Sequence, residues 1–315
     1  MGNMDININQ SQKSVTTALK ELRVLPIALE DELFRHYPAT KLGVSPHVEF
    51  YSEKLYEITK QILLSDPDQN WVITAPAYYH LPAAANLMAR DVHQLLQKQG
   101  FNAPLVEPRL QQKKIEFSSE EEFKKYLDYS KNNLKQRIAE RQRVQQLLQT
   151  DKLKTYFENR SVIIINDINV TGTQQHFMQQ EFDEYEVTSC HWLYIFNVDN
   201  QLAEDHPEVE YQINNSQLSD INSFAAVLAD ENTRHTARCI SRLFNESLEN
   251  FDHLINSLSD AGRERIFHLA EQEGRFNSPI FREKMQVLVD AQAATQATTR
   301  MQASKTPSPK VIVEL

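Results

Sequence analysis

The chain has few cysteines, few glycines and no long apolar run. Its 315 residues include two cysteines, Cys190 and Cys239, and six glycines. Two cysteines cannot build a four-cysteine zinc site, and the ten histidines show no His-Glu-x-x-His spacing, so the sequence contains no recognisable transition-metal motif. No apolar segment approaches the roughly 20 residues that cross a bilayer. Met1 to Lys13 lacks the apolar core of a secretory signal. We therefore expect a reduced, cytoplasmic protein that does not enter a membrane.

Positive charge is also scarce, since the formal net charge is -10. This acidic excess argues against charge-driven binding to nucleic acid or to an anionic membrane surface. A local basic pocket for a small ligand is still compatible with it. The sequence contains neither Gly-x-x-x-x-Gly-Lys nor Gly-x-Gly-x-x-Gly, so it predicts neither a P-loop nucleotide triphosphatase nor a dinucleotide-binding enzyme.

The middle of the chain alternates between strand-like and helix-like segments. Apolar runs typical of buried strands are separated by segments in which apolar residues recur at helical spacing. The predicted strands are residues 71–74, 103–106, 162–165 and 192–198. This order predicts an α/β fold, in which a mostly parallel sheet is flanked by helices.

The segments on either side are expected to be helical. The pattern from Val15 to Leu64 predicts N-terminal helices, and the sequence after about Ser216 predicts helices without a strand. We divide the chain into a flexible lead-in, an α/β domain that carries a helical insertion, a helical C-terminal region and a flexible tail. Their bounds are 1–15, 16–215 with the insertion at 119–150, 216–292 and 293–315.

The most informative segment runs from Ser161 to Gln174. A buried-type strand leads into Asn166 and Asp167, and a Thr-Gly-Thr turn around Gly172 then opens a helix. In parallel α/β sheets, ligands bind at the carboxyl ends of the strands. Backbone N–H groups at a helix N-terminus bind phosphate, and glycine lets the backbone approach a ligand closely. The carboxylate of Asp167 can accept hydrogen bonds from sugar hydroxyls, and we expect it to face solvent.

This segment resembles the ribose-phosphate signature of the type I phosphoribosyltransferases. That signature has four apolar strand residues, two acidic residues, two mostly apolar residues and a Thr-Gly turn. Asp167 matches the second acidic position, and Gly172 matches the glycine of the turn. Residues Trp71 to Arg90 resemble the pyrophosphate-loop unit of the same family: a strand, a tight loop at Ala75 to His80 and an Ala-rich helix. The resemblance covers roughly residues 70–200.

The resemblance implies an enzyme that binds phosphoribosyl pyrophosphate, with Mg carried by its pyrophosphate and no direct protein ligand to the metal. Such an enzyme transfers the 5-phosphoribosyl group to a nitrogenous acceptor. The implied catalytic residues are Asp167, Arg109 and Lys113, the last two standing where the family has a basic mobile loop. The implied donor-binding residues are Asn166, Val170, Thr171, Gly172, Thr173 and Gln174 in one loop, and Ala75, Ala77, Tyr78 and Tyr79 in the other.

Three positions depart from the family pattern. Asn166 replaces the first acidic residue, Val170 stands where some members carry an acid that acts on the base, and Gln174 replaces a common second Thr. Two hypotheses therefore stay open, an enzyme and a non-catalytic nucleotide-binding sensor or scaffold with the same fold. Arg109 and Lys113 could equally be part of a solvated basic patch. The sequence does not reveal the acceptor, and it leaves the oligomeric state open, dimers being the commonest arrangement.

Overall fold

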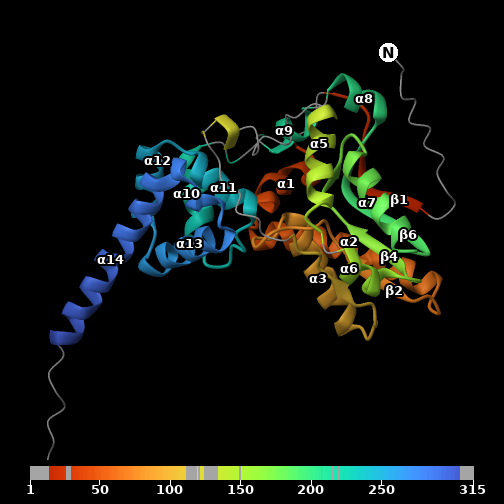
Figure 1. Cartoon of the computed structure of the whole chain (residues 1–315), viewed down its shortest axis with the longest axis horizontal. Coiled ribbons are helices and arrows are strands. Elements are labelled where there is room, and N and C mark those ends of the chain that lie inside the picture. Colours follow the sequence, from red (N-terminus) through yellow and green to blue (C-terminus); the bar gives the residue numbers. More distant parts are fainter. Residues whose placement is uncertain are drawn as a thin grey trace, which may run out of the picture.

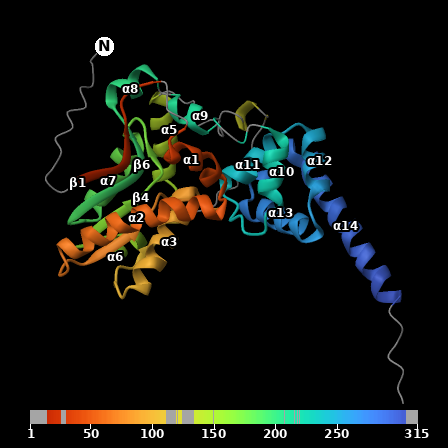
Figure 2. The same ribbon diagram turned by 180° about the vertical axis from the view of Figure 1, so that it is seen from behind.

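The computed structural model describes residues 14–25, 30–110, 119, 121–123, 134–148, 150–206, 208–214, 216, 218 and 220–305. Figures 1 and 2 show two parts side by side. One part holds the sheet and the helices that cover it. The other is a cluster of helices from the C-terminal third, and it adjoins the first where α1 (Glu32–Leu42) meets α11 (Ala237–Asn245).

The predicted α/β fold with a mostly parallel sheet is confirmed. The strands are β1 (Ser14–Leu22), β2 (Trp71–Thr74), β3 (Leu105–Val106), β4 (Ser161–Ile165), β5 (Ile168–Asn169) and β6 (Ser189–Val198). Their order is β1-β6-β4-β2-β3, with the short β5 also paired to β6, and each of these pairs is parallel. The four strands predicted from apolar runs are β2, β3, β4 and β6.

The start of the chain corrects the prediction. Residues from Val15 were expected to be helical after a lead-in ending at residue 15, but Ser14–Leu22 forms the strand at the edge of the sheet. Its backbone pairs with β6 from Ser14↔Cys190 to Leu22↔Val198. The side chains of an edge strand are only partly buried, and Val15 is 49% exposed. Backbone pairing therefore stabilises a strand whose side chains show no clear apolar pattern.

Both faces of the sheet are covered, and β4 shows how its sequence allows this. Ile163 and Ile165 belong to the core on one face, which α2 (Ser45–Ser65) and α3 (Ala84–Lys98) close. Val162 and Ile164 belong to the core on the other face, together with Phe157. Because successive strand residues point to opposite faces, a continuous apolar run fits a strand buried on both sides. The other helices of this part are α5 (Leu134–Gln145), α6 (Thr150–Phe157), α7 (Thr173–Glu184), α8 (Asn200–Asp205) and α9 (Val209–Asn214).

The predicted insertion at 119–150 contains the helix α5, and α6 begins at its last residue, Thr150. A side-chain cap lies at the start of the insertion, since the backbone N–H of Glu122 donates to Ser119 Oγ over 3.1 Å. The next residue, Phe123, is buried against Phe281 of the C-terminal part, with ring centroids 4.5 Å apart. The insertion therefore contacts the helical cluster.

The C-terminal part is helical, as predicted, and it has a core of its own. Its helices are α10 (Ile221–Ala229), α11, α12 (Leu248–Ser257), α13 (Asp260–Glu273), α14 (Arg282–Lys305) and two short 3-10 turns, η2 (Arg275–Asn277) and η3 (Pro279–Phe281). Phe244 and Phe276 stack at 4.1 Å in its centre. The helix α14 runs on to Lys305, beyond the predicted start of the tail at residue 293, and Figure 1 shows it projecting from the cluster. Within the described residues, no helix combines the length and the apolar character that crossing a membrane requires.

Candidate functional site

The two candidate ligand loops lie at the same edge of the sheet. Strands β2 and β4 are parallel neighbours, so the loop Ala75 to His80 and the loop from Asn166 to Gln174 leave their carboxyl ends next to each other. A cavity of about 30 Å³ lies between these loops and the helices α5 to α7. Its lining includes Pro76 and Ala77 from the first loop and Gln174 from the second. This cavity is too small for a phosphoribosyl group, so a ligand of the two loops would bind on their open side.

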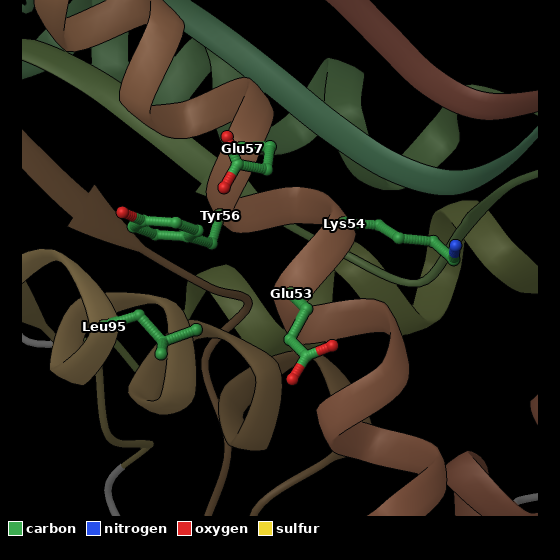
Figure 3. Close-up of a pocket in the computed structure, with 5 residues that line it drawn as sticks. All are labelled: Glu53, Lys54, Tyr56, Glu57 and Leu95. Atoms are coloured by element: carbon green, nitrogen blue, oxygen red, sulfur yellow. The ribbon is translucent and has the colours of Figure 1, made fainter.

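A larger hollow, of about 420 Å³, lies on a different surface (Figure 3). It is an open depression lined by Glu53, Lys54, Tyr56 and Glu57 of α2 and by Leu95 of α3. None of these residues belongs to the two loops. The hollow therefore contributes nothing to the candidate site.

Two of the departures from the family pattern form one hydrogen bond. Asn166 Nδ2 donates to Gln174 Oε1 over 3.1 Å, and Asn166 Oδ1 accepts from the backbone N–H of Asp167 over 2.9 Å. The Asn166 side chain is thus used to fix the loop. The acidic residue that the family has at position 166 could not donate this hydrogen bond to Gln174 Oε1, because a carboxylate has no N–H. Asn166 and Gln174 therefore depart from the family pattern as a pair that forms one contact.

The turn after β5 leaves a helix N-terminus available. Gly172 precedes α7 with a φ of 67°, and α7 carries no side-chain cap at this end. Asn169 Oδ1 accepts the Gly172 N–H over 3.1 Å, and the hydroxyls of Thr171 and Thr173 lie 2.8 Å apart. A Cβ added to Gly172 would meet nothing within 4 Å. The first turn of α7 therefore keeps N–H groups that no side chain caps, next to open space at Gly172, and a helix N-terminus of this kind can bind an anion.

Val170 lies in the same loop, but its side chain does not face a ligand. It is 5% exposed and belongs to the core that includes Ile163. Only the backbone of Val170 could contribute to binding.

Asp167 is buried, so the expectation that it faces solvent was wrong. Lys41 Nζ on α1 lies 2.5 Å from Asp167 Oδ2, and each of the two side chains is only 12% exposed. Lys41 Nζ also lies 3.2 Å from Glu210 Oε1 on α9. Burial by itself lowers the pKa of Lys41, but the charges of Asp167 and Glu210 outweigh it and raise that pKa. The ammonium group is therefore charged and bridges two carboxylates beside the turn.

Sequence reasoning missed Lys41, and no local signal could have found it. Lys41 precedes Asp167 by 126 positions. A lysine in the last turn of a helix is also ordinary, because it interacts favourably with the helix dipole.

The residue one helical turn before Lys41 carries an orphaned polar group. Tyr37 is fully buried, and its hydroxyl makes no hydrogen bond to any residue that the structure describes. Lys41 Nζ lies 5.5 Å from the centre of the Tyr37 ring. Burial, followed by the charges of Asp167 and Glu210, raises the pKa of Tyr37, so the phenol stays protonated.

The loop Ala75 to His80 is held by contacts with the segment around Pro108 and Arg109. Tyr78 is 5% exposed, its ring lies 3.9 Å below the Arg109 guanidinium, and its N–H donates to Pro108 O over 3.3 Å. The Tyr78 amide, which was predicted to face a ligand, therefore already has a backbone acceptor. The Ala77 N–H has no hydrogen-bond partner among the described residues. Ala77 thus remains a candidate ligand-binding amide, whereas Ala75 is a buried residue at the base of the loop.

Arg109, one of the two predicted basic residues, lies beside this loop. Its Nη1 donates to the carbonyls of Tyr79 and His80 over 3.1 Å each, and the residue is exposed. These bonds fix Arg109 next to the loop while its side chain stays accessible to a ligand. Lys113, the other predicted basic residue, lies outside the described residues.

The C-terminal helices reach the same edge of the sheet. Thr236 Oγ1 donates to the carbonyl of Lys41 over 2.7 Å, and the Ala237 N–H donates to Pro82 O over 3.0 Å. The Leu81 N–H donates to Glu273 Oε2 over 2.9 Å. The helical part thus contacts both α1 and the segment that follows the loop Ala75 to His80, so it borders the candidate site.

Among the described residues, no group of three or more His, Cys, Asp or Glu side chains is arranged as metal ligands. Asp167, the carboxylate nearest the turn, is already bound by Lys41. A divalent ion at this edge would therefore draw its ligands mainly from a phosphate-bearing ligand and from water, which suits the coordination habits of Mg²⁺.

The geometry agrees with the comparison against protein families. The model of the PRTase ComF-like family, a phosphoribosyltransferase-type family, matches residues 47–288. This match includes both loops and reaches from α2 into α14, well beyond the segment 70–200 to which the resemblance was confined. No curated protein and no solved structure was found to match. Because the family match covers more than half of its length, the chain belongs to the PRTase ComF-like family.

Proposed function

We propose that the protein is a phosphoribosyltransferase that binds phosphoribosyl pyrophosphate with Mg²⁺. It transfers the 5-phosphoribosyl group to a nitrogenous acceptor and releases pyrophosphate, and the same site allows the reverse phosphorolysis. The supporting observation is the N-terminus of α7, which has no side-chain cap and where a Cβ added to Gly172 would meet open space. The neighbouring loop Ala75 to His80 supplies a second set of backbone groups at the same edge.

Each part of the donor has a matching group in the two loops. The amides of Thr173 and Gln174 and the threonine hydroxyls suit the 5′-phosphate, because N–H groups and the helix dipole favour an anion there. Asp167 suits the ribose hydroxyls. The Ala77 amide and the Arg109 guanidinium suit the pyrophosphate.

Catalysis depends mainly on positioning the donor and the acceptor and on electrostatic stabilisation. The bond between ribose C1 and a pyrophosphate oxygen breaks, and a bond from C1 to the acceptor nitrogen forms. Positive charge develops on the sugar as the pyrophosphate leaves, so catalysis depends on holding the reacting groups and stabilising the leaving anion. Mg²⁺, when bound by the pyrophosphate, supplies charge neutralisation for that anion. Val170 offers no acid to act on the acceptor, which is compatible with an acceptor that is already nucleophilic.

A non-catalytic nucleotide-binding sensor or scaffold is the second candidate. Two contacts favour it: Asn166 is bonded to Gln174, and Asp167 is neutralised by Lys41. Both candidates require ligand binding at Gly172. Only the enzyme releases pyrophosphate.

A thermal melt tests the proposal. Phosphoribosyl pyrophosphate with Mg²⁺ at 100 times its dissociation constant should stabilise the wild type by about 2.7 kcal/mol, a shift of several degrees. Gly172→Val should abolish the shift, because the new side chain fills the space that the phosphate needs. Gly100→Val is the matched control, since Gly100 has a φ of 82° and equally open surroundings, but follows α3 at the opposite end of the β2–α3 unit.

Different outcomes separate the candidates. A shift in the wild type and in Gly100→Val, but not in Gly172→Val, supports the site, and pyrophosphate release in an acceptor screen then supports the enzyme. No shift in the wild type with phosphoribosyl pyrophosphate or with nucleoside monophosphates contradicts both candidates.

We also propose a cytoplasmic location, because Cys190 and Cys239 are buried and unpaired.

A further inference from the structure

Arg238 differs from its neighbouring arginines because its side chain has no partner in the part of the chain that the structure describes. Residues 230–280 are all described, and the five other arginines there are each bonded through the guanidinium group. Arg234 pairs with Asp91, Arg242 with Leu218 O, Arg263 with Asp260, Arg265 with the carbonyls of Leu228, Asp230 and Glu231, and Arg275 with Glu273. Arg238 makes no hydrogen bond and no ion pair with a described residue, although it is half-buried.

The position of Arg238 is fixed by its neighbours in the chain. It is the second residue of α11, directly after Ala237, whose N–H donates to Pro82 O. The helix cap, Thr236, donates to the carbonyl of Lys41. Arg238 therefore lies where the C-terminal helices meet both α1 and the segment that follows the loop Ala75 to His80.

The charge of Arg238 is not compensated locally. Its positive charge acts on two other cations, Lys41 and Arg242, and Lys41 already engages the carboxylates of Asp167 and Glu210. Two effects lower the pKa of Lys41: burial, which is the larger, and repulsion from the charge of Arg238. The charges of Asp167 and Glu210 outweigh both. Two neighbouring cations in a partly buried place are unfavourable, and a bound anion would relieve their repulsion.

We propose that the Arg238 guanidinium binds the pyrophosphate group of the donor. The planar fork of an arginine matches phosphate oxygens and forms strong, charge-assisted hydrogen bonds with them. The helical part would then do more than cover the site, because it contributes a cation that holds the leaving group. This inference rests on the proposed function. The phosphate oxygens could also belong to the ribose 5-phosphate end of the donor, and separate titrations distinguish the two.

Calorimetric titrations of the full chain test the proposal. Wild type, Arg238→Gln, Arg238→Lys and the control Arg35→Gln are each titrated with Mg-pyrophosphate and, separately, with ribose 5-phosphate. Arg35 is an exposed arginine of α1. Losing a charge-assisted contact should weaken pyrophosphate binding by roughly tenfold or more in Arg238→Gln, and by less in Arg238→Lys. The affinity for ribose 5-phosphate should be unchanged in both Arg238 variants. The affinities for both ligands should be unchanged in Arg35→Gln.

Three results would overturn the proposal. Unchanged pyrophosphate binding in Arg238→Gln removes Arg238 from the site while leaving the proposed function intact. A loss of ribose 5-phosphate binding alone contradicts the assignment to pyrophosphate. If the wild type binds neither pyrophosphate nor phosphoribosyl pyrophosphate, the proposed function fails, and this inference fails with it. Because the Arg238 side chain bonds to none of the described residues, melts without ligand should show that Arg238→Gln is as stable as the wild type. If Arg238→Gln folds poorly, the pyrophosphate affinity of Arg238→Lys is compared with that of the wild type instead.

Discussion

At the scale of single residues, Asp167 has a structural role as well as its proposed part in binding. Its ion pair with Lys41 is almost excluded from solvent. Removing one partner of such a pair leaves a buried charge without full compensation. We predict that Asp167→Asn weakens donor binding and also lowers the free energy of unfolding by about 3 kcal/mol, since only Glu210 is left to balance Lys41. Urea denaturation measures this loss.

A double variant separates the two roles of Asp167. In Lys41→Gln with Asp167→Asn, no buried cation is left, and the introduced amide can still donate a hydrogen bond to Glu210. We therefore predict that part of the lost stability returns while donor binding does not. Full stability of the single Asp167→Asn variant would contradict the structural role. Full donor binding by the double variant would contradict the binding role.

At the scale of elements, Gly43 determines how α1 and the C-terminal helices meet. It ends α1 with a φ of 92°, and an added Cβ would lie 2.0 Å from the carbonyl oxygen of Arg234. We predict that Gly43→Ala destabilises the protein by at least about 2 kcal/mol, because strain and a backbone clash add together. Gly100→Ala is the control, since it has a similar φ of 82° and no neighbour within 4 Å. Equal melting temperatures for the two variants would contradict this account.

The sequence predicted the strands that bury continuous apolar runs. It missed the edge strand, which is held by backbone pairing, and the site residues that only tertiary packing brings together. β2 and β4 were recognisable because they are covered on both faces. β1 was not, because an edge strand joined through its backbone needs no apolar alternation. The turn around Gly172 was recognisable from local residues, whereas Lys41, Glu210 and Arg238 come from helices distant in the chain. Their position depends on tertiary packing that no local pattern encodes.

At the scale of the whole molecule, buried histidines should make the protein sensitive to acid. Burial, followed by the charge of Arg265, lowers the pKa of His235 to about 4. In the unfolded chain the pKa of His235 is near 6.5, so between pH 6.5 and pH 4 the unfolded state binds more protons than the folded state. The stability is therefore fully present above pH 6.5 and falls as the pH drops toward 4. We predict a loss of about 2 kcal/mol from His235 between pH 7 and pH 5. Burial lowers the pKa of His36 and His47 in the same direction.

Urea midpoints at pH 7 and pH 5 check this prediction. His235→Phe should reduce the difference between them, because the ring that resists protonation is gone. An unchanged difference would show that His235 does not set the acid sensitivity.

The measurement that tests the central claim most directly is a calorimetric titration of phosphoribosyl pyrophosphate with Mg²⁺ into the wild type, Gly172→Val and Gly100→Val. If the loops at the carboxyl ends of β2 and β4 bind the donor, the wild type and Gly100→Val will bind it with the same affinity, and Gly172→Val will not bind. Equal binding by all three proteins would place the donor elsewhere and contradict the site. Binding by none of them would contradict the proposed function.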